Sequence, residues 1–300
     1  MHKIFSSIII IIVVFRASFS CSQNQDEDTT RVKGGYTACT VYDYKVTSGK
    51  FDTTTRYITS LSLYNTNGNR IEYWYYKPDK SLGHYVFYKY DADGNMTNEI
   101  FHLPNDTVYL EYLYYYDEMG RITGQAEKGN YWDKSVKSYE YNEDGDLINK
   151  RTYYQGSGLL NTSMVYQLDK NHKRIKAKYF NDYGVHYATF VYKYDDNGNM
   201  TEEWLINSDS SYSKQKTFKY DAKGNVISEE NDFFNNSPSY KAEYKYNTEG
   251  TRIEEIKYLS GGPGCYKQKY KYDADRNTIE IIDFNESNEP VSIKEFLYSK

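Results

Sequence analysis

Residues 90–96 read Tyr-Asp-Ala-Asp-Gly-Asn-Met, and variants of this stretch recur along most of the chain. Each copy starts with an aromatic or aliphatic anchor followed by Asp or Asn, and glycine usually stands four positions after the anchor. His172 and Arg276 replace that glycine in two copies. A fixed period of about 26 residues predicts one small structural unit stacked on its neighbours. The anchors are Tyr64, Tyr90, Tyr116, Tyr141, Leu168, Tyr194, Tyr220, Tyr246 and Tyr272, and Tyr298 opens a tenth unit.

Each unit is predicted to be a β-hairpin. Alternation in Tyr88-Lys89-Tyr90 places the rings on one face of a strand and the charge on the other. The turn follows, because an Asx side chain can bond its own backbone and glycine accepts a positive φ. A second strand begins with an aliphatic residue such as Met96, and residues 42–44 belong to a degenerate first unit. The polar face carries Lys89, Glu140, Gln167, Lys193, Lys219, Lys245 and Lys271.

The Tyr-Asp-x-x-Gly pattern resembles the YD repeat of the Rhs family. The clearest copies begin at Tyr90, Tyr116, Tyr194 and Tyr220, and the resemblance covers roughly residues 40–300. It implies a long antiparallel meander that curls into a spiral shell, which encloses a cargo in the large members. The family's Asp-Pro-rich self-cleavage segment and its toxin domain are not found in the sequence. We therefore expect no delivered-toxin role.

Strand spacing independently predicts curvature. Two strands per unit at about 4.8 Å each make nine units a ribbon of about 85 Å, and open sheets seldom exceed about ten strands. The predicted fold is all-β: an antiparallel meander of about nine to ten 26-residue hairpin repeats that forms a curled or spiral sheet, with the aromatic face inside. An outer-membrane barrel is the less favoured alternative. Its lipid face would need an apolar band, whereas one face here is charged and the other is rich in tyrosine.

The first twenty residues have the pattern of a secretion signal, with Lys3 before an apolar run from Ile4 to Phe15. Twelve helical residues rise only about 18 Å, short of a hydrocarbon core of about 30 Å. Cleavage after Ser20 would expose Cys21, as in the lipobox of bacterial lipoproteins, although the small residues here would also suit an ordinary signal peptidase. We predict lipidation at Cys21, an acidic tether over 21–35 and a repeat domain over 36–300.

The acidic residues 26–28 resemble an export signal of some Gram-negative lipoproteins, and a solvated linker is the alternative. They favour a protein that is lipid-anchored in the cell outer membrane and exposed at the surface. The net charge is −5 and no basic block is present, so nucleic acid is not an expected partner. The negative charge also disfavours anionic partners. The 37 tyrosines argue against disorder.

The sequence contains no recognisable catalytic motif, and its five histidines lack metal-ligand spacing. We expect no enzyme activity, no cofactor and no metal, and we expect Cys39 and Cys265 to be unpaired. The turns at 91–94 and 195–198 are similar to calcium loops but lack the glutamate that such a loop needs, so a turn role is favoured.

Four aromatic residues are weak candidates for binding, since exposed aromatic groups mark contact surfaces. They are Trp74, Tyr75, Trp132 and Trp204, and packing within the sheet is the simpler role for each. The sequence thus favours an exported, lipid-anchored, non-enzymatic scaffold that binds a glycan or protein at the cell surface. The alternative is a purely structural envelope or shell component of the Rhs type.

Overall fold

The computed structural model describes residues 31–47, 50–129, 135–154, 158–232, 239–259 and 265–300. No helix in these ranges is both long and apolar enough to cross a membrane. The described residues form β-strands and one short 3-10 helix, η1 (Thr53–Thr55). The strands are β1 (Ala38–Thr47), β2 (Lys50–Phe51), β3 (Tyr57–Tyr64), β4 (Arg70–Tyr76), β5 (Leu82–Tyr90), β6 (Met96–His102), β7 (Val108–Tyr116), β8 (Ile122–Gly129), β9 (Ser135–Tyr141), β10 (Leu147–Tyr154), β11 (Leu160–Leu168), β12 (Arg174–Phe180), β13 (His186–Tyr194), β14 (Met200–Asn207), β15 (Tyr212–Tyr220), β16 (Val226–Asn231), β17 (Tyr240–Tyr246), β18 (Arg252–Leu259), β19 (Cys265–Tyr272), β20 (Thr278–Phe284) and β21 (Pro290–Ser299).

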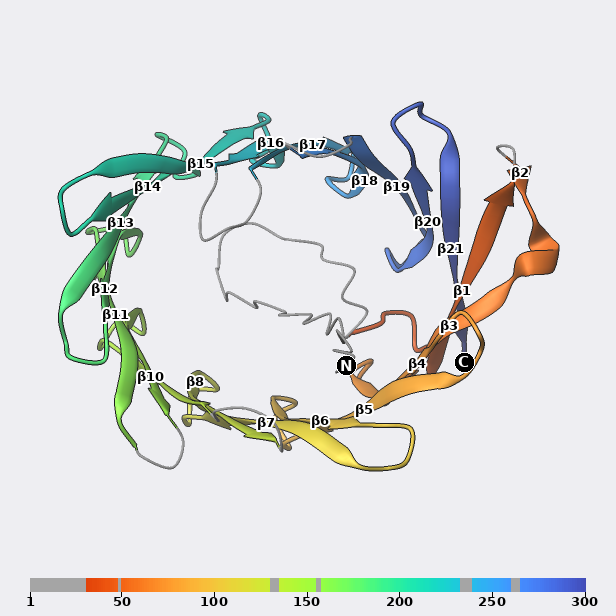
Figure 1. Cartoon of the computed structure of the whole chain (residues 1–300), viewed down its shortest axis with the longest axis horizontal. Coiled ribbons are helices and arrows are strands. Elements are labelled where there is room, and N and C mark those ends of the chain that lie inside the picture. The colour runs from red at the N-terminus through yellow and green to blue at the C-terminus, as the bar shows by residue number, and fades with distance from the viewer. Residues whose placement is uncertain (1–30, 48–49, 130–134, 155–157, 233–238, 260–264) are drawn as a thin grey trace, which may run out of the picture.

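The hairpins form a closed barrel (Figure 1). Each strand from β3 to β21 pairs antiparallel with the next, and β1 pairs with both β3 and β21, so that 20 of the described strands form one ring. The all-β hairpin meander is confirmed, but the expected curled or spiral sheet is wrong, because the sheet closes. At a tilt of about 40° and a spacing of about 4.8 Å, 20 strands give a backbone radius of about 20 Å.

Closure joins the first and last strands of the sheet. β21, which contains Tyr298, lies where the first strand of a tenth unit is expected. β1 pairs with β21 at the position that the second strand of this unit would occupy, and eight residue pairs join the two strands, from Ala38 opposite Ser299 to Lys45 opposite Ser292. An open meander would leave both edges unpaired, whereas this pairing satisfies both at once.

The anchor tyrosines face the interior of the barrel. Residues 31–37, in red-orange, lie inside the ring in Figure 1. In this segment Val32 is 5% exposed and packs in a cluster with Tyr64 and Tyr270, while Tyr36 lies 5.3 Å from the ring of Tyr298. The last residues of the expected 21–35 tether therefore pack against the inner wall. The opposite face of each strand points outward.

A repeated hydrogen bond joins neighbouring hairpins on this inner face. The hydroxyl of each of eight anchor tyrosines donates to the backbone carbonyl of the residue that starts the preceding hairpin's second strand, at 2.6–2.9 Å. Leu168 stands at an anchor position without a hydroxyl. The tyrosine period is therefore explained by a bond between repeats in addition to ring packing. The donor and acceptor pairs are Tyr90 and Arg70, Tyr116 and Met96, Tyr141 and Ile122, Tyr194 and Arg174, Tyr220 and Met200, Tyr246 and Val226, Tyr272 and Arg252, and Tyr298 and Thr278.

The turns have the predicted chemistry. Asp91 Oδ1 accepts hydrogen bonds from the backbone N–H groups of Asp93 and Asn95, at 3.0 and 2.8 Å, and Gly94 has a φ of +86°. Hydrogen bonds from Asn95 and the turn backbone hold the pKa of the Asp91 carboxyl below its usual value. His172 and Arg276 keep the left-handed conformation of the glycines they replace, with φ of +63° and +67°.

Polar groups share the inner face with the tyrosines, which corrects part of the expected packing. The aliphatic residue predicted at the start of each second strand does place Met96 opposite Tyr90. Two residues earlier, however, Tyr88 lies opposite the buried Glu99. Burial raises the pKa of the carboxyl of another inner glutamate, Glu203. The inner wall is therefore an aromatic and polar lattice.

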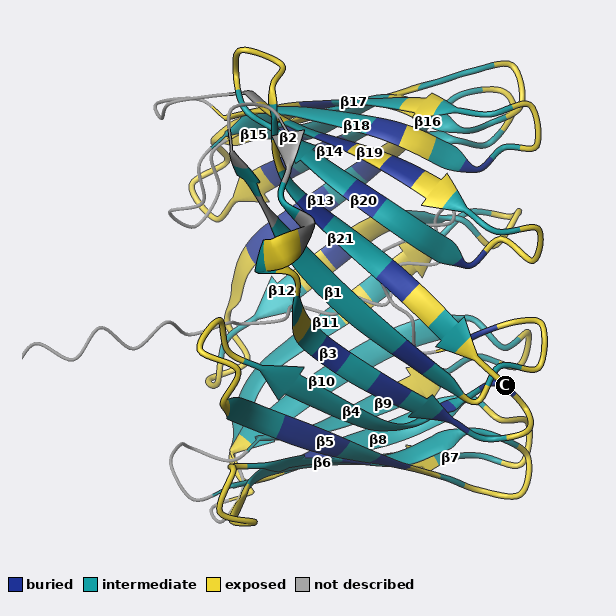
Figure 2. Ribbon diagram, turned by 90° about the vertical axis from the view of Figure 1, so that its right-hand side faces the viewer, coloured by how far each residue is buried: buried dark blue, intermediate teal, exposed yellow. Residues whose placement is uncertain are grey.

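The outer face carries ion pairs between the strands of single hairpins. Lys193, Lys245 and Lys271, which the sequence placed opposite the tyrosines, bind Glu202, Glu254 and Glu280 at 2.8, 2.6 and 2.6 Å. In each pair the two residues are direct cross-strand partners. Figure 2 shows the tilted strands as largely intermediate in burial, with most of the exposed residues in the loops at the two rims.

Candidate functional site

Two of the four predicted binding residues occupy equivalent positions on opposite walls. Trp74 in β4 and Trp204 in β14 are 130 residues apart, which is five repeats. Their strands are ten steps apart in either direction around the ring (Figure 1). Tyr75 follows Trp74 in the strand and so points to the inner face. Trp132 and the predicted lipid attachment site Cys21 lie outside the described residues. The structure therefore does not bring the predicted residues together.

Trp74 belongs to an aromatic stack on the outer face. Its ring centroid lies 4.5 Å from that of Tyr85, and Tyr85 lies 4.6 Å from His102, with interplanar angles of 16° and 9°. Phe87 meets both Trp74 and Tyr85 edge-on. Tyr85 is only 5% exposed, and its hydroxyl donates to Asp106 at 2.7 Å. We call Trp74, Tyr85, Phe87 and His102 the Trp74 stack, and its rings contact mainly one another.

Trp204 lies among charged side chains instead. Its indole Nε1–H donates to Glu202 at 2.8 Å, as that of Trp74 does to Glu72 at 2.9 Å. The ammonium groups of Lys193 and Lys214 lie 5.0 and 5.1 Å from the indole ring, within cation–π range. Both lysines also bind Glu202, at 2.8 and 2.5 Å. Hydrogen bonds from Lys193, Lys214 and Trp204 lower the pKa of the Glu202 carboxyl to about 2.

Strand pairing extends this site into two rows across the outer face of β12–β15. Direct cross-strand partners have Cβ atoms about 5 Å apart, so each row spans roughly 15 Å. With Lys193 and Glu202, the rows hold four lysines and one glutamate. We call this set the Trp204 surface. The rows are Lys176, Val191, Trp204, Lys214 and Lys178, Thr189, Ile206, Tyr212.

The Trp204 surface is open to solvent at several positions, although Trp204 itself is half-buried and Thr189 is buried. Tyr212 is 73% exposed, its ring lies 5.9 Å from that of Trp204, and Ile206 beside it is also exposed. Lys176 and Lys178 are exposed as well. The neighbouring loop contains Asp209, whose carboxylate accepts hydrogen bonds from Ser211. Planar aromatic and cationic groups thus lie side by side on a solvent-accessible part of the outer face.

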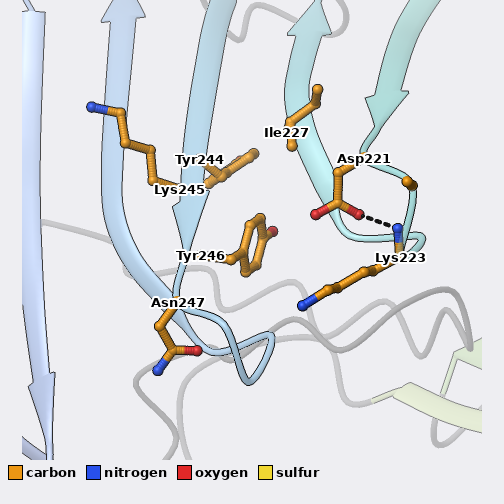
Figure 3. A pocket seen from close by; sticks show the side chains of 8 residues that line it. Asp221, Lys223, Ile227, Tyr244, Lys245, Tyr246 and Asn247 are labelled. Atoms are coloured by element: carbon orange, nitrogen blue, oxygen red, sulfur yellow. Dashed lines mark hydrogen bonds between the residues drawn. The ribbon is translucent and has the colours of Figure 1, made fainter.

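Two hollows lie on β15–β18, and the larger, of about 490 Å³, is shown in Figure 3. The polar groups that line it hold the turns together. Tyr246 donates its hydroxyl to the carbonyl of Val226 at 2.7 Å, and Lys223 donates to the carbonyl of Thr248 at 2.7 Å. Lys245 is paired with a glutamate of the neighbouring strand. This hollow is the space between stacked hairpins and offers no evident catalytic group.

Within the described residues, one cluster could offer ligand atoms to a metal ion. Oxygen atoms of Asp144 and Asp146 and a ring nitrogen of His172 lie within 4.8 Å of one another. The sequence search missed it, because the ligands come from the turns of consecutive repeats. His172 Nδ1 lies 2.7 Å from Asp146 Oδ2, and this contact raises the pKa of the imidazole. The ion pair between His172 and Asp146 already gives both side chains a charged partner, so the cluster does not need a metal ion to balance its charges.

Cys39 is a free, buried cysteine at 1% exposure. Burial raises the pKa of its thiol to about 12, so the thiol stays protonated at neutral pH and is a poor nucleophile. The unpaired state expected for Cys39 is therefore observed. The side chain of Cys265 lies outside the described part of the chain.

No protein-family model and no curated protein matches the chain. Among solved structures, the TcdB2-TccC3 complex is 13% identical with a TM-score of 0.37, over 77% of this chain and 16% of that chain. The Photorhabdus luminescens Tc holotoxin pore is 10% identical with a TM-score of 0.29, over 78% and 19%. The chain spans less than a fifth of these toxin chains. A porin-like protein from Bacteroides uniformis is 8% identical with a TM-score of 0.37, over 89% and 98%. We transfer no function from likenesses this weak.

Sequence reasoning identified Trp204 and placed Lys193 on the polar face, but it missed Lys176, Lys178 and Lys214. Lys176 and Lys178 belong to an ordinary alternating stretch, and Lys214 precedes a β-bulge. Only the pairing of β12 with β13 and of β14 with β15 places them in rows with the indole. Alternation predicts which face a lysine occupies, but register decides its neighbours.

Proposed function

We propose that the chain is an exported, lipid-anchored protein of the cell surface whose barrel is a non-enzymatic scaffold for binding a glycan or protein. The observation that carries the proposal is the Trp204 surface, where the half-buried Trp204 and the exposed Tyr212 lie beside lysines. Aromatic groups exposed together mark contact surfaces, and Trp, Tyr and Arg dominate binding energy at interfaces. The proposed anchor at Cys21 and the YD-repeat relationship rest on the sequence alone.

The charged side chains on the outer face favour a barrel whose outer wall contacts water. Lys193, Lys245 and Lys271 and their glutamate partners lie on the outer face. A lysine at the bilayer midplane of a β-barrel costs about 2–4 kcal/mol, and an outer-membrane barrel needs an apolar outer band. In the proposed arrangement the N-terminal lipid holds the protein at the outer membrane, and the rims and outer wall are free to bind.

The full-length protein tested on a glycan array, and as bait for surface proteins, addresses the binding role. We expect a defined ligand whose binding Trp204→Ala weakens and Trp74→Ala leaves intact. Absence of any glycan or protein ligand would refute the binding role. Fatty-acid labelling tests the anchor separately: wild type should be labelled and Cys21→Ala should not, and an unlabelled wild type would remove the anchor.

A structural shell component is the second candidate, and closure of the barrel favours it. The ring has no free sheet edge, and its inner wall is held by the tyrosine bonds between repeats. Barrels of this strand number enclose space rather than a packed core. Under this alternative the outer wall would contact only copies of the chain or other envelope material.

A further inference from the structure

We propose that the Trp204 surface binds an anionic polysaccharide whose sugar rings carry carboxylates, a polyuronate. The inference rests on the binding role proposed above and specifies the ligand class. It differs from the expectation drawn from net charge, because a chain with an overall charge of −5 gathers four lysines against one glutamate in this place.

The charge at the centre of the surface is only partly balanced. Glu202 is shared by Lys193 and Lys214, at 2.8 and 2.5 Å, so one carboxylate faces two ammonium groups. Its lowered pKa shows that this carboxylate is held ionised by its partners. A ligand carboxylate that approaches Lys193 or Lys214 therefore meets a local excess of positive charge. This complementarity would also be weakened by salt.

Further lysines extend the excess along the sheet. Lys176 and Lys178 are exposed on β12 and project from the outer face about 7 Å apart, two residues along the strand. Lys176 lies in the same row as Lys214, about three strand spacings away. Positive charges therefore recur over a strip of roughly 15 Å. A polymer with one carboxylate on each ring can meet several of them at once.

Aromatic faces favour a sugar over other polyanions. The rings of Trp204 and Tyr212 lie in adjacent rows, and Tyr212 is 73% exposed. A pyranose ring offers a flat C–H face that can pack on such a ring while its carboxylate and hydroxyls reach Lys193, Lys214 and Glu202. An acidic peptide or an anionic headgroup supplies the charge but not a stack of flat rings.

The two most informative probes are polygalacturonate and its methyl ester, which keeps the ring and removes the charge. We expect the full-length protein to bind polygalacturonate at least tenfold more tightly than the ester, with affinity falling as salt is raised. Lys176→Gln/Lys178→Gln and Trp204→Ala should each weaken binding roughly tenfold. The matched controls on other parts of the outer face, Lys89→Gln/Lys128→Gln and Trp74→Ala, should bind like wild type.

The possible failures are distinguishable. Equal binding of the acid and the ester, equal binding of polyglutamate, or equal binding of anionic lipid vesicles would overturn the polyuronate assignment. Binding that survives the Lys176/Lys178 and Trp204 variants would show that the ligand binds elsewhere, and would also overturn it. In those cases the scaffold role stands. Only a failure to bind any glycan or protein, on the array and with these probes, removes the proposed function itself.

Discussion

Trp74 and Trp204 occupy the same position of two hairpins on opposite walls, yet their cross-strand neighbours differ. Each indole N–H donates to a glutamate two residues earlier, and each ring lies on the outer face. Across the next strand, Trp74 meets Tyr85 and Trp204 meets Lys214. The glutamates differ in the same way, because Glu72 lies opposite Leu63 and Glu202 opposite Lys193.

This comparison separates what the repeat requires from what it leaves open. Both hairpins keep the anchor tyrosine and the tight Asx turn, and the second strand of each accepts the hydroxyl bond of the next anchor tyrosine. The outer positions are free to vary, since the barrel closes by backbone pairing and inner packing. One wall uses this freedom for an aromatic stack, and the other uses it for an exposed cationic platform.

The largest difference between the two walls should appear in the free energy of unfolding when each tryptophan is replaced by alanine. Truncating a packed Trp typically costs about 3–5 kcal/mol, so we expect Trp74→Ala to lower the free energy of unfolding by about 3 kcal/mol. Trp204→Ala should cost only about 1 kcal/mol, because lysine stems and an exposed tyrosine surround its ring. Urea denaturation measures both. Equal losses would contradict the distinction between the Trp74 stack and the Trp204 surface.

Substitutions of a feature that the two walls share should instead change the free energy of unfolding by similar amounts. Tyr90→Phe and Tyr220→Phe each remove a hydroxyl that donates to a strand carbonyl, at 2.7 and 2.6 Å. Each loss should cost about 1–1.5 kcal/mol, and the two values should agree within about 0.5 kcal/mol. The unfolding midpoints of the two variants test this. A clear inequality would mean that the tyrosine bonds are not equivalent around the ring.

The sequence was informative where the physics is local. Period, turn chemistry and alternation predicted the hairpins, the inward tyrosines and the outward lysines, because each depends on residues close in the chain. Closure depends on Ala38–Lys45 meeting Ser292–Ser299, which are some 250 residues apart. The inner glutamates and the lysine rows likewise depend on register between strands. Local patterns do not contain that information.

Protonation of Glu202 gives a third test of the comparison. The pKa of this carboxyl is lowered to about 2, so its pairing with Lys193 and Lys214 is fully present above the unfolded pKa near 4.5. The contribution is then lost as the pH falls from about 4.5 through about 2. Glu202→Gln should therefore unfold with a shallower pH dependence than wild type over this interval. An unchanged slope would show that the two lysines do not hold Glu202 in solution.

The smallest expected effect concerns the turns that depart from glycine. Arg276 holds a φ of +67°, where an L-residue is strained and glycine is not. Glycine also loses more conformational freedom on folding, so the net gain from Arg276→Gly should be about 0.5 kcal/mol.

His172→Gly relieves the same strain but removes the ion pair with Asp146. The pKa of His172 is raised by that contact, so the pair contributes fully below the unfolded pKa near 6.5 and is lost as the pH rises through the folded pKa. His172→Gly should thus stabilise the protein more at pH 9 than at pH 5, whereas Arg276→Gly should stabilise it equally at both pH values. Thermal unfolding at the two pH values measures this difference. If both variants gain equally at pH 5, the His172 contact adds nothing beyond the turn.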